Sequence, residues 1–310
     1  MTSATWLPRL GHRRDWQSLA YVTALPALAA WQWVHGFSVL LYAPMLFLTL
    51  GIGTIHHNHV HRPMWHGRRA NRLTDFVLTL LQGYPSFIFW PSHVANHHRH
   101  GHGEKDLART YRFARGDTND LLGYLLHPFE AVPKLYPLFR DRLGELRRRR
   151  PRAYRYCQAQ CALWLGSWAL LLAVDWQRAL LFVIVPQLHG IHWLLATNYL
   201  QHAHADGRSS AQGEGAARGS RGIALNYARN FEGLLNPLLF NIGLHTAHHE
   251  NPSVHWFELV ELHRTHYRDR VDAALNEHGV VPYMFRVYVL GAVLPRYRSH
   301  SLMASDSTQS

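Results

Sequence analysis

Histidine is the residue type that dominates the chemistry available to this chain. There are 25 histidines in 310 residues, and 11 of them fall in four short segments: 55–61 (IHHNHVH), 93–98 (HVANHH), 198–202 (NYLQH) and 245–249 (HTAHH). Residues three or four positions apart in a helix lie on one face. Neutral imidazole is a ligand that suits iron, zinc, copper and nickel. The spacing therefore predicts that helices aim pairs of imidazoles at metal ions.

The number of clustered histidines predicts more than one ion. Eight of them have ligand spacing, which exceeds what a single ion can hold: His57, His61, His93, His97, His98, His245, His248 and His249. We therefore expect two metals, with His202 as a ninth ligand. In the crowded first cluster, His56 could take the place of His57. Cys157 and Cys161 alone can build neither a disulfide framework nor a thiolate metal site.

Four apolar stretches without charged residues must position these clusters. Each approaches the length of about 20 residues that a bilayer requires, and they cover residues 18–34, 38–55, 157–174 and 179–200. Very short links at 35–37 and 175–178 join them in pairs. The pattern predicts an all-α integral membrane protein with two transmembrane helical hairpins, hence four spans. The alternative is a soluble α protein with four buried helices.

Arginine placement gives the predicted orientation. The chain has 32 basic and 20 acidic residues, a net charge of +12. Basic residues precede the first span, follow the second and crowd 140–155 before the third, whereas the two hairpin tips hold one arginine. By the positive-inside rule, the termini and the histidine clusters are cytoplasmic. The 140–155 run favours contact with anionic lipid headgroups. No nucleic-acid-binding motif is present, so we expect no nucleic-acid partner.

The remaining segments predict a single domain, residues 1–310, with a cytoplasmic cap that carries the histidine clusters. Residues 73–90 and 120–139 are apolar but interrupted by proline or glycine, which indicates interfacial or re-entrant helices. Residues 205–222 are rich in Gly, Ser and Arg and predict a flexible loop. Residues 301–310 are expected to be a disordered tail.

The clusters HNHVH, HVANHH and HTAHH, in this order and between two apolar hairpins, resemble the histidine boxes of the membrane fatty acid desaturase and alkane hydroxylase superfamily. NYLQH is similar to the additional Asn-x-x-x-His element of that superfamily. The resemblance covers roughly residues 18–265. It implies a membrane-bound non-haem di-iron oxidoreductase in which the nine histidines hold two Fe²⁺ ions and Asn198 holds a water near one of them. The middle box departs from the pattern, with three residues between His93 and His97 where two are commoner.

The resemblance also implies a reaction. The expected activity is O2-dependent oxidation of an unactivated C–H bond of a fatty acyl chain, with desaturation as the favoured outcome. Hydroxylation, carotenoid ring oxidation and oxidative decarboxylation of a free fatty acid to a terminal alkene are alternatives. The expected location is the bacterial inner membrane. The sequence has no haem, Rossmann or Fe–S motif, so an external ferredoxin-type carrier with its reductase would deliver electrons.

A histidine-rich metal transporter is the alternative from a different functional class. Transporters place their ligands near the bilayer midplane, whereas these clusters adjoin the ends of the predicted spans. The position of the histidines therefore favours an enzyme.

Overall fold

The computed structural model describes residues 8–111, 116–207 and 225–303. In this part of the chain almost all regular structure is helical, and the only sheet is a pair of two-residue parallel strands, β1 (Asn230–Phe231) and β2 (Asn276–Glu277). Two compact units are present. Unit 1 combines Met1–Phe89 with Asp141–Trp193, and unit 2 combines Trp90–Arg140 with Leu194–Ser310. The mostly helical architecture agrees with the predicted fold class.

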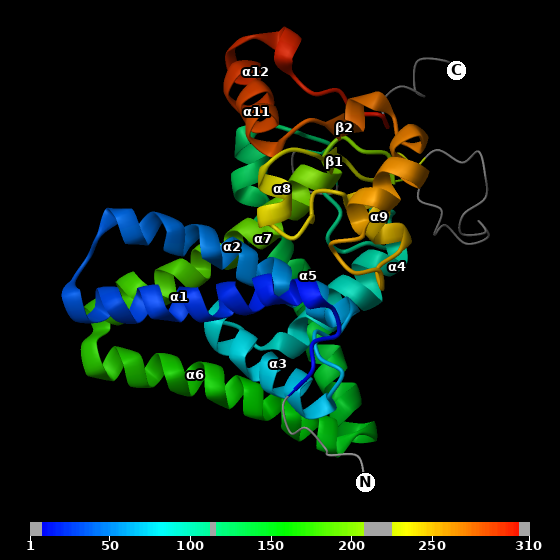
Figure 1. Cartoon of the computed structure of the whole chain (residues 1–310). Coiled ribbons are helices and arrows are strands. Elements are labelled where there is room, and N and C mark those ends of the chain that lie inside the picture. The colour runs from blue at the N-terminus through cyan, green and yellow to red at the C-terminus, as the bar shows by residue number, and fades with distance from the viewer. Residues whose placement is uncertain (1–7, 112–115, 208–224, 304–310) are drawn as a thin grey trace. The chain divides into compact units, whose positions relative to one another are not determined.

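The first predicted hairpin of unit 1 consists of α1 (Trp16–His35) and α2 (Val39–His61). The chain reverses at Gly36, whose φ of 94° is a conformation that glycine adopts without strain. The two helices then run side by side in opposite directions (Figure 1). α2 continues well past the predicted span end at residue 55. As a result, the first histidine cluster occupies the last turns of the same helix.

The second predicted hairpin is also a helical segment with a reversal. α6 (Pro151–Ala179) is followed by the π-helical turn η4 (Leu180–Ile184) and by α7 (Val185–His202). Asp175 lies inside α6 with the non-helical angles φ −158° and ψ 96°, at the predicted link. Its Oδ1 accepts a hydrogen bond from the Arg178 backbone N–H at 3.0 Å. The chain turns back at this point (Figure 1).

Two helical segments of the described chain are long and apolar enough to cross a membrane: Val39–His61 and the continuous Pro151–His202. Only 17% of the most apolar window in the second segment is buried. Leu165, Leu170 and Val174 are among its exposed side chains. A core helix of a soluble protein would bury such a face, so this exposure favours a lipid environment. The crossing by α1, and hence four spans, stays a prediction.

Polar contacts join the apolar helices within unit 1. α3 (Arg68–Gln82) takes up most of the predicted interfacial segment 73–90, and a turn at Gly83 and the 3₁₀ helix η2 (Ser86–Ile88) follow it. The Tyr156 hydroxyl of α6 donates to the Asp75 carboxylate of α3 at 2.7 Å. Gln187 of α7 accepts from Trp168 Nε1 and donates to the Leu80 carbonyl, both at 2.7 Å.

Unit 2 holds most of the histidine clusters on short helices. It includes the first part of α5 (Leu121–Arg149). This part corresponds in sequence to the predicted interfacial segment 120–139. Its other elements in the described residues are the π-helix η3 (Trp90–His97), α4 (His98–His100), α8 (Leu235–Leu238), α9 (His245–Glu250), α10 (Leu259–Leu262), η6 (His263–Tyr267), η7 (Arg268–Arg270), η8 (Ala273–Leu275), α11 (Val280–Met284), η9 (Phe285–Leu290), α12 (Gly291–Val293) and η10 (Pro295–Tyr297).

The predicted loop and tail are described only at their edges. Ala205 is fully buried in a small core with Leu225, Tyr227 and Leu275, against which Leu302 packs. The Leu302 backbone N–H donates to the His204 carbonyl at 3.1 Å. Residues 208–222 of the predicted loop and 304–310 of the predicted tail lie outside the described residues.

The buried side chain of Arg229 fixes the end of α7 beside β1. Its Nη1 donates to the carbonyls of Leu200 and Ala203 at 3.0 and 2.9 Å. These carbonyls lie at the helix C-terminus, which favours a cation. The guanidinium also lies 4.8 Å from the centroid of the Tyr283 ring. Arg229 therefore holds in place the helix end that carries His202.

Candidate metal centre

Four buried histidines of unit 2 form a cluster that we call the tetrad: His97, His202, His245 and His249. They come from η3, α7 and α9, segments that are far apart in the sequence. One nitrogen of each ring lies within 4.8 Å of the others. The His245 Nε2 atom is central, since it lies 3.0 Å from Nε2 of both His202 and His249.

The outer nitrogens of two tetrad rings are fixed by hydrogen bonds. Nδ1 of His202 donates to the Tyr227 carbonyl at 2.7 Å, and Nδ1 of His97 lies 2.7 Å from Asp106 Oδ2. A neutral imidazole that donates through Nδ1 presents a lone pair at Nε2. Nε2 of His97 is buried and has no hydrogen-bond partner among the described residues. Lone pairs that converge in this way fit a cation.

The spacing of the nitrogens also fits a metal ion. Two nitrogens at right angles on a metal with bonds of about 2.1 Å are separated by about 3.0 Å. This equals the two Nε2–Nε2 distances at His245. Burial lowers the pKa of His249 well below its usual value, and the neighbouring imidazoles of His245 and His97 lower it further. The neutral, ligating form of this ring is therefore favoured.

Asp106 is the carboxylate that orients the tetrad from outside. Burial alone would raise its pKa, but His97 and hydrogen bonds hold that pKa below its usual value. Oδ2 also accepts from the His102 backbone N–H at 2.9 Å, and Oδ1 from the Ala108 N–H at 2.8 Å. An ionised, rigid acceptor keeps the His97 proton on Nδ1. Loss of such a hydrogen-bonding partner typically lowers metal affinity by about 10- to 100-fold.

We expect Asp106→Asn to weaken metal binding by about 10- to 100-fold, because the amide can no longer fix the His97 tautomer as an anionic acceptor. The measurement is metal retained by purified protein during dialysis against graded chelator. Glu104→Gln is the matched control, since this nearby side chain is exposed. Equal retention by both variants would contradict the role of Asp106.

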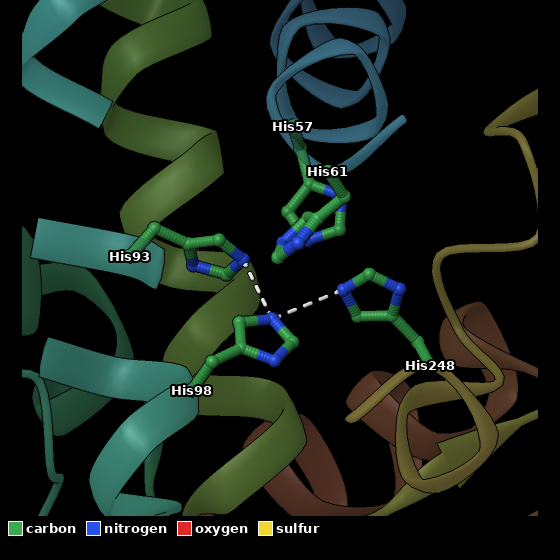
Figure 2. Close-up of side chains that lie close together, drawn as sticks. All are labelled: His57, His61, His93, His98 and His248. Carbon is green, nitrogen blue, oxygen red and sulfur yellow. Dashed lines mark hydrogen bonds between the residues drawn. The ribbon is translucent and has the colours of Figure 1, made fainter. Parts of the chain in front are cut away.

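A second cluster of unit 2, which we call the triad, consists of His93, His98 and His248. Nε2 of His98 lies 3.0 Å from Nε2 of His93 and 3.1 Å from Nε2 of His248 (Figure 2). These separations match those of the tetrad. The three rings come from η3, α4 and α9, so the clusters at 93–98 and 245–249 each supply histidines to both groups.

The π-helical form of η3 explains how the middle cluster divides. The sequence predicts that His93 and His97, four residues apart, share a face. In a π-helix the hydrogen bonds connect residues five apart, and η3 spans Trp90–His97. His93 therefore has its Nε2 atom 3.0 Å from that of His98. The ring of His97 lies 5.3 Å from that of His93 but belongs to the tetrad. The extra residue of this box is thus accommodated as part of a π-helix, and the two histidines of the predicted pair fall in different clusters.

In unit 1, α2 presents His57 and His61 one turn apart (Figure 2). Their ring centroids are 5.2 Å apart, and one nitrogen of each lies within 4.8 Å of the other. His56, the alternative ligand, packs its ring 4.8 Å from that of Phe89. His59 Nδ1 instead accepts the Met64 backbone N–H at 3.1 Å. The geometry of α2 favours His57 over His56.

Asn198 lies one turn before His202 on α7. Its amide nitrogen donates to the Ala108 carbonyl at 2.8 Å and lies 3.4 Å from Nε2 of the buried His127. With this nitrogen engaged, only Oδ1 remains to hold a water. His127 has no histidine three or four residues away, so spacing does not predict its position beside Asn198.

His102 is a further histidine that lies beside the tetrad. It is fully buried, adopts the left-handed conformation at φ 66°, and stacks on His202 with ring centroids 4.9 Å apart. Burial lowers its pKa to about 3. Its ring therefore stays neutral and covers one face of the His202 ring.

Comparison with known proteins places these clusters in a family. The model of the fatty acid desaturase family matches residues 11–281, which include all the histidines of the tetrad and triad. No curated protein and no solved structure is detectably similar to the chain. The family match extends over far more than half of the sequence, and the buried histidine clusters fit it. The chain therefore belongs to the fatty acid desaturase family.

Proposed function

We propose that this protein is an integral-membrane oxidoreductase that uses O2 to oxidise an unactivated C–H bond of a fatty acyl chain, with desaturation as the reaction. The observation that carries the proposal is the tetrad: four buried imidazoles whose nitrogens converge, in a member of this family. A merely structural cluster would not need lone pairs fixed toward one point.

Two Fe²⁺ ions are the proposed cofactor. The tetrad would hold one ion, and the triad would supply ligands to the other. His57 and His61 stay ligands predicted from the sequence. When bound, the iron pair supplies the activation of O2 that a C–H bond of this strength requires. Imidazole ligands suit iron. In addition, Asn198 would position a water through its Oδ1 atom.

The residues of the chain have three tasks in this reaction. Asp106 and the Tyr227 carbonyl hold protons on the outer nitrogens of His97 and His202. Burial of the tetrad keeps bulk water away, which limits side reactions. Neutral imidazoles in place of thiolates provide ligands that resist the oxidant. Each task follows from a contact or a burial described above.

A cavity in unit 1 fits the hydrocarbon substrate. Its volume is about 400 Å³, within the usual range for ligand pockets. The lining is almost entirely apolar and includes Leu25, Trp33 and Phe182, with Gln187 among the few polar groups. An alkyl chain is a better match to this lining than a hydrated metal ion, which favours the enzyme over a transporter.

Product analysis tests the function. Cells that express the protein are compared, with and without O2, by mass spectrometry of their lipids and hydrocarbons. The expected product has two hydrogens fewer than the substrate and requires O2. An added oxygen would indicate hydroxylation, and a terminal alkene one carbon shorter would indicate decarboxylation. Metal flux in vesicles without any oxidised product would contradict the enzyme.

The membrane topology is a separate proposal. Four crossings would leave both termini and all the histidine clusters in the cytoplasm of a bacterial inner membrane. An external ferredoxin-type carrier, reduced by its reductase, would then approach the arginine-rich segment around 147–155. Carriers of this kind are usually acidic, so opposite charge would favour the encounter.

Reporter tags check this topology. We expect a tag at residues 35–37 or 175–178 to report the outer side, because these links hold almost no positive charge. Tags at either terminus or within 205–222 should report the cytoplasm. A periplasmic signal from 205–222 would separate His202 from the other clusters and contradict the proposed centre.

A further inference from the structure

The C-terminal helix of unit 2 has one buried face and one exposed face. α11, η9 and α12 form a continuous helix from Val280 to Val293, which we call the C-terminal helix. Tyr283, Val287 and Tyr288 are buried. The Tyr288 hydroxyl donates to Asn119 Oδ1 at 3.0 Å, and Asn119 Nδ2 donates to the Tyr283 hydroxyl at 2.6 Å. The helix is therefore firmly held on unit 2.

The opposite face exposes a line of apolar side chains at four-residue intervals: Val281, Phe285, Val289 and Val293, each 50–76% exposed. Such a stripe in water would be costly, since exposed apolar area is unfavourable. At 1.5 Å per residue, 14 residues give a length of about 21 Å, short of the roughly 30 Å hydrocarbon core. The helix can therefore neither cross a bilayer nor hide this face within unit 2.

The charged residues on and after the C-terminal helix are basic. Residues 278–303 contain Arg286, Arg296 and Arg298 and no acidic residue. Arg286 pairs with Glu277 at 2.6 Å. Arg296 and Arg298 are exposed and form no ion pair with any described residue. Arg298 Nε donates to the Gly291 carbonyl at 3.0 Å, which holds this positive charge close to the helix end.

We propose that the C-terminal helix is a membrane-surface anchor that lies in the plane of the bilayer interface. Its apolar stripe enters the boundary between headgroups and acyl chains, and Arg296 and Arg298 bind anionic phospholipid headgroups. An apolar face beside exposed basic residues is the pattern of interfacial helices. α5, which contacts this helix through Tyr124 and Tyr288, also exposes an apolar residue, Phe129.

Lipid is a better match than a protein partner for two reasons. An acidic electron carrier would pair with the arginines but would leave the uncharged stripe unmatched. A second copy of the chain would bring its own unpaired arginines to the same surface. The helix also lies almost entirely beyond residue 281, where the family match ends. The proposal is therefore independent of the metal centre and of the reaction.

Site-directed spin labelling of the full-length protein in lipid nanodiscs tests this anchor. The discs contain phosphatidylcholine with anionic phosphatidylglycerol, and Cys157→Ala and Cys161→Ala remove the native thiols. Labels are attached at Phe285→Cys and Val289→Cys. Ala274→Cys is the matched control, since Ala274 is an exposed residue elsewhere in unit 2. Relaxation by O2, which concentrates in lipid, is compared with relaxation by a water-soluble nickel chelate.

The expected result is a higher ratio of O2 to nickel relaxation at Phe285 and Val289 than at Ala274. A ratio equal to that of Ala274 would show that the stripe faces water and would overturn the proposal. Protection from both reagents would show a protein cover and would overturn it too. Arg296→Gln with Arg298→Gln, or discs without the anionic lipid, should lower the ratio at Val289. An unchanged ratio would overturn the headgroup contact.

Discussion

His245→Ala should remove metal from the tetrad and abolish turnover. Nε2 of His245 is the nitrogen that lies 3.0 Å from two other donors, so its loss leaves the three remaining rings without their common neighbour. Loss of even an outer partner of a ligand usually costs about 10- to 100-fold, and loss of the ligand itself should cost more. The measurement is the ratio of bound metal to protein, together with turnover.

The control for this experiment is His278→Ala, since His278 is exposed and lies outside every cluster. It should retain both metal and activity. Because His245 is buried, the variant must also be compared with wild type for helix content by circular dichroism. A folded His245→Ala protein with full metal content and normal turnover would remove the tetrad as a metal centre.

Two single-residue deletions should differ in their effect on metal binding: one should retain the metal and the other should lose it. Deletion of Ala95 shortens η3 and reduces the separation of His93 and His98 from five residues to four. In a regular α-helix, this spacing places both on one face. Deletion of Ala247 from α9 has no π-helical turn to absorb it. It rotates His248 and His249 by about 100° relative to His245 and should disperse both clusters.

Bound metal per folded protein again provides the measurement. We expect the Ala95 deletion to retain most of its metal and the Ala247 deletion to lose nearly all of it. Loss of metal in both variants would mean that η3 contributes more than the spacing of His93 and His98. Retention in both would contradict the assignment of α9 as a source of ligands.

The sequence predicted the ligand types better than their grouping. Spacing within each cluster was enough to select histidines that lie together, because helical periodicity is a local property. The division of the middle cluster between tetrad and triad depends on the π-helical hydrogen bonds of η3. Spacing alone does not reveal those bonds, so the residues alone did not indicate that His93 and His97 belong to different clusters.

Other features escaped the sequence for similar reasons. His127 has no histidine at a helical spacing, and the burial of His102 against His202 and of His127 beside Asn198 is a tertiary property. The reversal at Asp175 was predictable, since a charged link between apolar stretches is a local signal. Spacing alone does not distinguish Asp106 from the nearby Glu104, because the contact of Asp106 with His97 depends on the fold.

The tetrad draws its first donor from residue 97 and its last from residue 249. During synthesis, no ion can meet all four rings until most of the polypeptide has left the ribosome. An ion that binds only the assembled site adds its binding free energy to the stability of the folded protein. Metal supply would thus act as a late checkpoint in biogenesis, and iron-starved cells should accumulate a protease-sensitive form of the protein.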